Sequence, residues 1–334
     1  MADAPEADGV PYHQLVVRSL RSVGRDVHLV LDPVRLGASI PQAWWLLGRL
    51  RPAAVFTTGG YLGIPLVLAA RARGIPSLLW EGNVIPGRAT AAVGRWSARV
   101  AVSFPPTLER FPGRSFVSGT PIRSFAGIDR AEARASFDVD RDDRLLLVFG
   151  GSQAVARITA AFDEVLARVL GDWRVLHLTG RSGFAEAAAL CERLPVEVRD
   201  RYRPVAFLTD RMAAALVAAD LVLGRAGSST CAEVAAVGAA SILVPYPHAG
   251  DHQRANAAWL ADHGAALTIP DRELIGARLF DELQALRDDA RRQAMAEAAR
   301  ALGRPEAADV IAAALLAMAE GRPLPSETTM DRAT

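Results

Sequence analysis

Short apolar segments alternate with longer Ala- and Leu-rich segments along most of the chain. The short runs, bounded by Gly and Pro, predict buried strands, and the longer segments predict helices. In the first part of the chain the predicted strands are 15–17, 53–57, 77–80, 100–103 and 116–118, and the predicted helices are 42–50, 65–73 and 86–98. Strands and helices in this order, joined by short turns, indicate a parallel sheet wrapped by helices.

The same alternation starts again after a charged stretch at 129–144. Here the predicted strands are 145–149, 174–178, 202–206, 220–223 and 240–244, the predicted helices are 154–169, 184–194, 210–219 and 252–263, and 279–321 is almost entirely helix-forming. We therefore expect an α/β protein made of two Rossmann-like, doubly wound parallel-sheet domains that face a cleft. The expected domains are 1–128 and 129–321, with the option that the last helix packs back on the first domain, and 322–334 is expected to be a flexible tail.

Composition narrows the class of protein. The 334 residues are 51% hydrophobic but contain no long uninterrupted apolar run, and the first residues are acidic, so we expect neither a membrane span nor a signal peptide. Two cysteines are too few for a disulfide framework, which favours the cytoplasm. All 38 basic residues other than His are Arg: residues 1–128 carry 14 Arg and 7 acids, and residues 129–334 carry 24 Arg and 30 acids. The basic first part is expected to be attracted to an anionic surface such as lipid headgroups or nucleic acid, with an ordinary solvated surface as the alternative.

The segment GRAGSSTCAEV at 224–234 is the most informative motif. A predicted buried strand ends there in a loop of small residues, and a helix begins, so backbone N–H groups are free to bind an anion. The residues predicted to bind a diphosphate are Gly227, Ser228, Ser229 and Thr230. Arg225 is expected either to neutralise the charge of the diphosphate or only to form an ion pair at the surface. Glu233 is predicted to accept the two hydroxyls of a ribose. The structural alternative is a capping box, because Thr230 and Glu233 have its spacing.

Two further motifs fit the same kind of pocket. Gln253 and Asn256, in DHQRANA, lie three residues apart on one helix face, where their amides suit sugar hydroxyls, although exposed polar residues are the simpler alternative. Ser152, in GGSQ, follows a strand and is placed to donate to a phosphate or merely to cap a helix. His248 and His252 flank an Asp without the spacing of a metal site, so we expect no metal.

The first part of the chain supplies fewer candidates. Gly59, Gly60 and Tyr61 follow one predicted strand and Glu81 follows the next. Glu81 is either a solvated loop acid or, if it faces the cleft, a group that orients a hydroxyl or acts as a base. The Trp44, Trp45 and Leu46 cluster is expected to be core rather than membrane anchor.

Taken together, the motifs resemble the MurG family of inverting GT-B glycosyltransferases. The segments GGY, WEGN, GTPIR, GGSQ, FLTDRM, RAGSSTCAE and HQRANA occur in family order. The resemblance implies transfer of N-acetylglucosamine from UDP-N-acetylglucosamine to lipid I, forming lipid II in peptidoglycan synthesis. It implies a peripheral protein at the cytoplasmic face of the membrane that needs no cofactor and binds no nucleic acid, with a UDP-sugar donor and a polyprenyl-diphosphate-linked acceptor.

The resemblance also assigns roles to residues. For the nucleotide, Arg123 and Ser152 would bind phosphates, Leu208 would lie along the uracil, and Glu233 would bind the ribose. Base and diphosphate would be held by Ser228, Ser229 and Thr230, and the sugar hydroxyls would be bound by Gln253 and Asn256. The acceptor side would contain Gly59, Gly60, Tyr61, Glu81 and Asn83.

The chain departs from the family pattern at several positions. Trp80 and Gly82 replace a His and a Gln, and Thr90 stands where an Asn is expected. The family's opening strand and glycine-rich loop, with its His base, have no counterpart in the sequence, so we expect the true start to lie upstream and take Glu81 as the candidate base. The alternatives are another UDP-sugar-dependent glycolipid transferase, an epimerase, or a UDP-sugar-binding protein without turnover.

Overall fold

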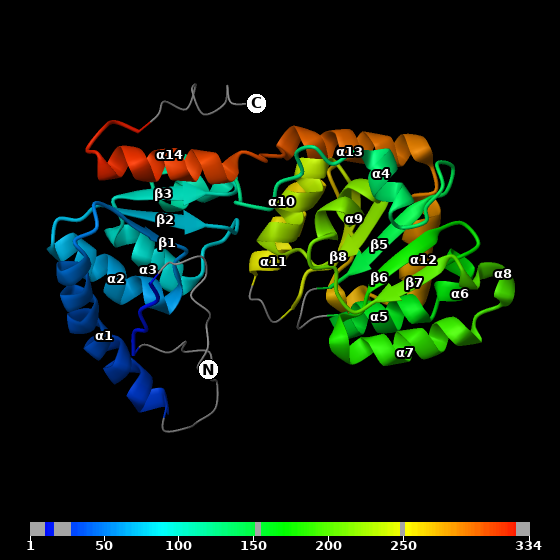
Figure 1. Cartoon of the computed structure of the whole chain (residues 1–334), viewed down its shortest axis with the longest axis horizontal. Coiled ribbons are helices and arrows are strands. Elements are labelled where there is room, and N and C mark those ends of the chain that lie inside the picture. Colours follow the sequence, from blue (N-terminus) through cyan, green and yellow to red (C-terminus); the bar gives the residue numbers. More distant parts are fainter. Residues whose placement is uncertain (1–10, 17–27, 151–154, 248–250, 325–334) are drawn as a thin grey trace.

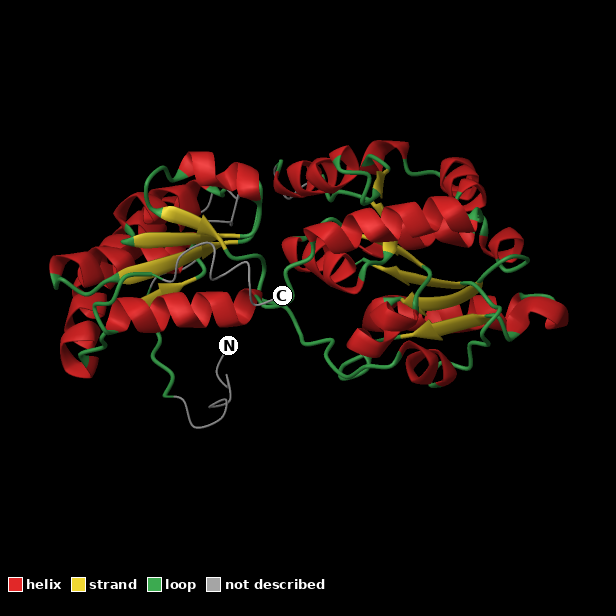
Figure 2. Ribbon diagram, turned by 90° about the horizontal axis from the view of Figure 1, so that it is seen from above, coloured by secondary structure: helices red, strands yellow, loops and turns green. Residues whose placement is uncertain are grey.

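The computed structural model describes residues 11–16, 28–150, 155–247 and 251–324. They form two α/β domains, each built on a parallel sheet with helices packed against it (Figures 1 and 2). The first domain contains α1 (His28–Leu50), β1 (Val55–Thr57), α2 (Gly60–Ala72), β2 (Ser77–Glu81), α3 (Arg88–Trp96), β3 (Arg99–Val102), the 3₁₀ helix η2 (Pro105–Arg110) and β4 (Ser115–Val117).

The second domain is larger. Its first part contains α4 (Arg130–Ala135), β5 (Leu145–Phe149), α5 (Val155–Asp163), α6 (Leu166–Val169), β6 (Arg174–Leu178), α7 (Gly180–Arg193), α8 (Val196–Arg199), β7 (Tyr202–Val205) and α9 (Met212–Ala218). Its second part contains β8 (Leu221–Gly224), α10 (Ser228–Val237), β9 (Ala240–Leu243), α11 (His252–Asp262), β10 (Leu267–Thr268), the 3₁₀ helix η3 (Asp271–Glu273), α12 (Gly276–Ala285) and α13 (Asp289–Leu302). The last helix, α14 (Ala307–Ala319), follows.

The four strands of the first sheet are parallel, in the order β1-β2-β3-β4. Side chains alternate between its two faces: Leu79 and Val100 pack with α2 and α3, whereas Leu78 and Ala101 pack with α14. Because both faces are covered, the strands read in the sequence as continuous apolar runs. α14 thus lies against the sheet of the first domain although it follows the second domain in the sequence (Figure 1).

The second sheet has six parallel strands in the order β10-β9-β8-β5-β6-β7. The chain starts at β5, adds β6 and β7 on one side, and then crosses to add β8, β9 and β10 on the other. The reversal between β5 and β8 is a topological switch point, and loops at the carboxyl ends of these two strands are the usual place for a ligand in such a sheet. In the sequence, GGSQ follows β5, and RAG joins β8 to α10.

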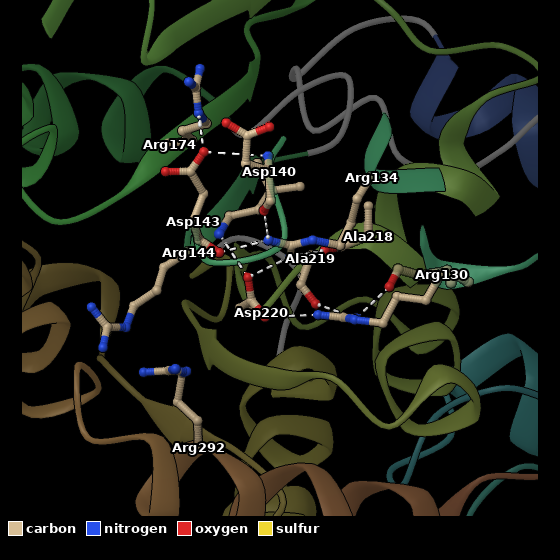
Figure 3. Close-up of polar contacts among 12 residues, drawn as sticks. Arg130, Arg134, Asp140, Asp143, Arg144, Arg174, Ala218, Ala219, Asp220 and Arg292 are labelled. Atoms are coloured by element: carbon tan, nitrogen blue, oxygen red, sulfur yellow. Dashed lines mark hydrogen bonds and ion pairs between the residues drawn. The ribbon is translucent and has the colours of Figure 1, made fainter. Parts of the chain in front are cut away.

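An ionic network fixes α4 at the opposite, amino-terminal edge of this sheet (Figure 3). The carboxylate of Asp220 pairs with Arg130 at 2.7 Å and with Arg134 at 2.9 Å, and it also accepts the backbone N–H of Leu145 at 2.8 Å. Asp143 beside it pairs with Arg174 at 2.5 Å. Burial alone would raise the pKa of Asp143, but the hydrogen bond and charge of Arg174 outweigh it and hold that pKa below its usual value. This network is structural, because it lies at the end of the sheet away from the predicted site.

Several element predictions are corrected by the structure. Residues 15 and 16 form no strand, and α1 extends from His28 to Leu50 rather than over 42–50 alone, because it continues through Pro41, which the sequence analysis took as outside the helix. Segment 154–169 is divided into α5 and α6, and 279–321 into three helices. Trp44 and Trp45 are 42% and 61% exposed, so the prediction that they are core residues is wrong: α1 buries the face of Ala43 and Leu47 instead.

Candidate active site

The loop after β8 ends at the amino terminus of α10. Gly227 is the N-cap residue, with extended backbone and no side-chain hydrogen bond to the helix. The first-turn N–H groups, those of Ser228, Ser229 and Thr230, have no partners within a helix and carry its positive partial charge. The capping-box alternative is therefore wrong, since Thr230 lies inside the helix and Gly227 occupies the cap. This helix terminus is suited to bind a diphosphate.

Glu233, one turn further along α10, is paired with Arg123. The Arg123 Nε lies 2.7 Å from the Glu233 Oε1, and the Glu233 residue is only 6% exposed. Arg123 comes from the segment between β4 and α4, which connects the two domains. The structure thus brings together two residues that were predicted to bind the ribose and the phosphates, although 110 positions separate them in the sequence.

Arg225 forms an ion pair with a residue outside α10. Its guanidinium is buried, lies 2.5 Å from an Asp271 carboxylate oxygen, and also contacts the Val244 carbonyl oxygen at 3.3 Å. Asp271 neutralises its charge, so the geometry favours an anchoring role for Arg225 over the predicted phosphate contact.

The two amide residues of α11 also have partners inside the protein. The Gln253 Oε1 accepts the backbone N–H of Tyr246 at 2.9 Å and so fixes the turn before the helix. Asn256 is fully buried, with both N–H groups of its amide donating within the protein, to Asn83 and to Ala226. Contact of these residues with sugar hydroxyls stays a prediction, and for Asn256 the observed hydrogen bonds do not favour it.

Glu81 ends β2 and is 3% exposed. Its Oε1 accepts two hydrogen bonds from Asn83, from the backbone N–H at 2.8 Å and from Nδ2 at 3.0 Å. Burial raises the pKa of Glu81, and the hydrogen bonds from Asn83 and the charge of the nearby His252 only partly oppose this. A carboxylate with a raised pKa is a better proton acceptor, as a general base requires. The alternative of a solvated loop acid is excluded by this burial.

The GGY segment lies at the carboxyl end of β1, close to the start of α3. Gly59 and Gly60 have φ values of 79° and 69°, a region that favours glycine. The Gly60 N–H donates to the Thr90 Oγ1 at 3.3 Å, and a Cβ on Gly59 would lie 2.6 Å from the Thr90 methyl group. Thr90, which replaces the Asn of the family pattern, thereby joins this turn to α3. Tyr61 is partly exposed beside it.

The departures at Trp80 and Gly82 compensate one another. A Cβ on Gly82 would lie 2.6 Å from the Trp80 ring and 3.0 Å from the Ser228 Oγ, so no larger residue fits there without displacement. The Trp80 indole N–H donates to the Gly119 carbonyl at 3.1 Å. The indole ring therefore occupies space that a side chain at 82 would need, and the loop backbone approaches the α10 terminus closely.

Three predicted residues remain, Leu208, Ser152 and His248, and the structure describes only the first of them. Leu208 follows β7, is partly buried, and packs against the core of the second domain. Ser152 and His248 lie outside the described residues. Within the described part of the chain, no group of three or more His, Cys, Asp or Glu is placed to hold a metal ion.

The sequence analysis missed two residues that shape the site. The His252 Nδ1 lies 2.7 Å from the Ile85 carbonyl oxygen, and the Thr107 Oγ1 lies 3.1 Å from the carbonyl oxygens of both Asn83 and Val84. His252 was considered only as a metal ligand. No local pattern marks either residue, because both act on a loop that is distant in the sequence.

A separate cavity of about 280 Å³ lies between the domains. It is lined on one side by Thr120 and Arg304, from the two segments that connect the domains, and on the other by Cys231 and Trp259. None of the predicted donor-binding residues lines it. Burial raises the pKa of Cys231 to about 12, so its thiol stays protonated and is not a nucleophile.

Models of known protein families match both domains. The model of the glycosyltransferase family 28 N-terminal domain matches residues 1–102, and that of the glycosyltransferase family 28 C-terminal domain matches residues 145–311.

Individual proteins extend this match over most of the chain. A Desulforudis audaxviator protein named UDP-N-acetylglucosamine--N-acetylmuramyl-(pentapeptide) pyrophosphoryl-undecaprenol N-acetylglucosamine transferase is 37% identical over 316 residues, which cover 91% of this chain and 83% of that protein. A Salinibacter ruber protein of the same name is 36% identical over 319 residues, covering 95% and 85%. The crystal structure of Acinetobacter baumannii MurG superimposes with a TM-score of 0.70 at 28% identity, covering 91% of this chain and 84% of that one.

Proposed function

The chain belongs to the MurG family of glycosyltransferases, and from this premise we propose that it transfers N-acetylglucosamine from UDP-N-acetylglucosamine to lipid I. The product is lipid II, the disaccharide-linked polyprenyl diphosphate of peptidoglycan synthesis. The relatives named above carry this activity in their names.

The amino terminus of α10, with the Glu233–Arg123 pair one turn behind it, is the observation that carries the proposal. The N–H groups of Ser228, Ser229 and Thr230 would bind the diphosphate, where a helix terminus offers both donors and positive partial charge. The carboxylate of Glu233 would accept the ribose hydroxyls. Stabilising the departing diphosphate in this way assists the reaction because negative charge develops on it in the transition state.

The transfer itself exchanges one C–O bond for another. The acceptor hydroxyl of lipid I attacks C1 of N-acetylglucosamine from the face opposite the diphosphate, the bond from C1 to the diphosphate oxygen breaks, and UDP leaves. The hydroxyl proton passes to a base, and Glu81 is our candidate because it is buried and its pKa is raised. The configuration at C1 inverts. Gly59, Gly60, Tyr61 and Asn83 would lie on the acceptor side.

Incubation with radiolabelled UDP-N-acetylglucosamine and lipid I tests this function. We expect label in lipid II and release of one UDP per transfer. Label that stays in the nucleotide sugar, as N-acetylmannosamine, would instead identify a 2-epimerase. The structure of a UDP-GlcNAc 2-epimerase from Neisseria meningitidis, with a TM-score of 0.61 at 11% identity, has the same fold. Binding of the donor without any product would contradict catalysis.

We also propose that α1 docks the protein on an anionic membrane at its cytoplasmic face. Val34 and Trp45 are 63% and 61% exposed and lie three turns apart on one side of α1, and Leu50 at its end is 48% exposed. The Arg49 guanidinium lies over the Trp45 ring at 5.7 Å. Exposed aromatic rings beside Arg suit the headgroup region, where the rings enter the apolar boundary and the cations meet lipid phosphates. Within the described residues no helix is both long and apolar enough to cross a bilayer.

Sedimentation with vesicles tests this membrane contact. Vesicles with anionic lipid should bind the wild-type protein, and the double change Trp44→Ser and Trp45→Ser should reduce the bound fraction several-fold, with UDP binding unchanged. Phe184→Ser is the matched control, since Phe184 is 41% exposed on α7 of the other domain. An equal loss of vesicle binding in both variants would contradict the proposal. So would equal binding to anionic and neutral vesicles.

A further inference from the structure

Asn256 connects segments that belong to both domains. Its Nδ2 donates to the Asn83 Oδ1 at 3.1 Å and to the Ala226 carbonyl oxygen at 3.2 Å, and its Oδ1 accepts the N–H of Val84 at 3.0 Å. An Asn amide has two N–H donors, so both are engaged. The residue is fully buried, and an unpaired buried amide would be costly. These hydrogen bonds give Asn256 a structural task between domains.

The bonds of Asn83 continue this connection to the candidate base. While the Asn83 Oδ1 accepts from Asn256, the Asn83 Nδ2 donates to the Glu81 Oε1 at 3.0 Å. Turning either amide over would bring oxygen against oxygen or N–H against N–H, so each fixes the orientation of the other. The series Ala226, Asn256, Asn83, Glu81 therefore allows only one orientation of each amide, with Asn256 donating to both Ala226 and Asn83 and Asn83 donating to Glu81. The series starts next to Gly227, the cap of α10.

The loop that contains Asn83 is held from both domains. Thr107 of the first domain donates to the carbonyl oxygens of Asn83 and Val84, both at 3.1 Å. His252 of α11, one turn before Asn256 on the same helix face, binds the Ile85 carbonyl oxygen at 2.7 Å. His252 is also the titratable group of the second domain whose charge acts on Glu81. Two residues of α11 thus set the position of a loop in the other domain.

We propose that Asn256 is a positioning residue for the transfer reaction: through Asn83 it aligns the Glu81 carboxylate with the donor-binding terminus of α10. It does so by contact between the domains and not by binding the sugar. This proposal rests on the proposed function. Because the alignment depends on the second domain being in place, the carboxylate is correctly oriented only where Ala226 and the α10 terminus lie beside it. A small rotation between the domains would disconnect the base from the donor site.

Asn256→Asp is the decisive variant, because it keeps the shape but replaces the two N–H donors by an oxygen that faces the Asn83 and Ala226 oxygens. Steady-state kinetics should show kcat lowered at least 10-fold, with the KM for UDP-N-acetylglucosamine within about 3-fold of wild type. The pH profile of kcat should also shift in its acidic limb, where Glu81 titrates. Asn83→Ala interrupts the same series from the other domain and should reproduce the loss of kcat. Arg254→Ala is the control, since Arg254 is exposed on the same helix and pairs with Asp251.

If Asn256 binds the sugar, its replacement should affect the donor KM more than kcat. In that case Asn256→Asp would raise the donor KM and remove the difference in affinity between UDP-N-acetylglucosamine and UDP, and kcat would change less. That result would overturn the inference. So would a kcat of Asn256→Asp equal to that of a wild-type protein that transfers normally. If the wild type transfers nothing, the proposed function fails instead.

Hydrogen–deuterium exchange then decides the inference independently of activity. The 82–87 segment should lose protection in Asn256→Asp and keep it in Arg254→Ala. Unchanged protection of this segment in Asn256→Asp would show that Asn256 does not hold the loop. Thermal unfolding of each variant, measured in parallel, identifies any that are globally unfolded, and Asn83→Ala supplies a second test should Asn256→Asp be one of them.

Discussion

Replacing Arg123 by Ala distinguishes two roles for its guanidinium, binding the diphosphate of the donor or holding Glu233. In the free protein Arg123 lies 2.7 Å from Glu233, with 42% of the Arg123 side chain exposed. An ion pair with this exposure contributes only about 0.5–1 kcal/mol. If ribose hydroxyls displace Arg123 from Glu233, binding of the ribose must break this ion pair. Arg123→Ala removes the ion pair beforehand, so uridine should bind about 2- to 5-fold more tightly.

UDP should respond with the opposite sign. A guanidinium released from Glu233 toward the diphosphate would make charge-assisted hydrogen bonds worth about 1.5–3 kcal/mol. When the gain of about 0.5–1 kcal/mol from breaking the ion pair is subtracted, Arg123→Ala should weaken UDP binding by about 0.5–2.5 kcal/mol, or roughly 2- to 70-fold. Glu233→Gln, by contrast, removes the charged acceptor of the ribose and should weaken uridine and UDP by similar factors.

Isothermal titration calorimetry of the wild type and both variants with uridine and with UDP measures these differences. Arg254→Ala serves as the control for a general loss of positive charge, because Arg254 is exposed and pairs locally with Asp251. If Arg123→Ala weakens uridine as strongly as UDP, then Arg123 acts only by orienting Glu233, and its assignment to the phosphates is wrong.

Three further predictions concern stability. Asp220→Ala leaves the buried Arg134 without its carboxylate and the Leu145 N–H without an acceptor, so urea unfolding should show a loss of about 2–4 kcal/mol; a loss below about 1 kcal/mol would refute this account of the network. Burial lowers the pKa of His177 to about 4. Its neutral form therefore stabilises the fold fully above the unfolded pKa of about 6.5, and the free energy of unfolding should fall by up to about 3 kcal/mol as the pH drops to 4. The difference between the pH profiles of unfolding of wild type and His177→Gln should isolate this dependence. Gly94→Ala would place a Cβ 2.2 Å from the Phe111 ring and should cost about 1–3 kcal/mol, whereas Gly37→Ala in open space should be neutral or stabilising in the same thermal assay.

The strands of the second domain could be predicted well from the sequence. Segments 145–149 and 174–178 coincide with β5 and β6, because strands that are buried on both faces appear as uninterrupted apolar runs between Gly-rich turns. Helix limits were less predictable. α2 starts at Gly60, five residues before the predicted start, since tertiary contacts rather than local preference decide where such an apolar segment begins to coil.

The surface of α1 shows where pattern alone fails. Trp44 and Trp45 are large and apolar, and the sequence analysis took them for core residues. α1 packs through Ala43 and Leu47, with its Trp side chains left outside. An apolar residue only favours burial, and which face a helix buries depends on the neighbours that the fold supplies.

The sequence by itself determined the two parallel sheets and the position of the α10 terminus that we propose as the diphosphate site, because both follow from local patterns: apolar runs for the strands, and small residues between a strand and a helix for the terminus. Only the tertiary structure decided which groups Arg225, Arg123 and Asn256 contact. The sequence allowed Asn256 to be a sugar ligand, yet its partner Asn83 lies 173 positions away, in the other domain. A polar side chain carries the same donors and acceptors wherever it lies, so its partner is determined by the packing of the two domains and not by the residues beside it.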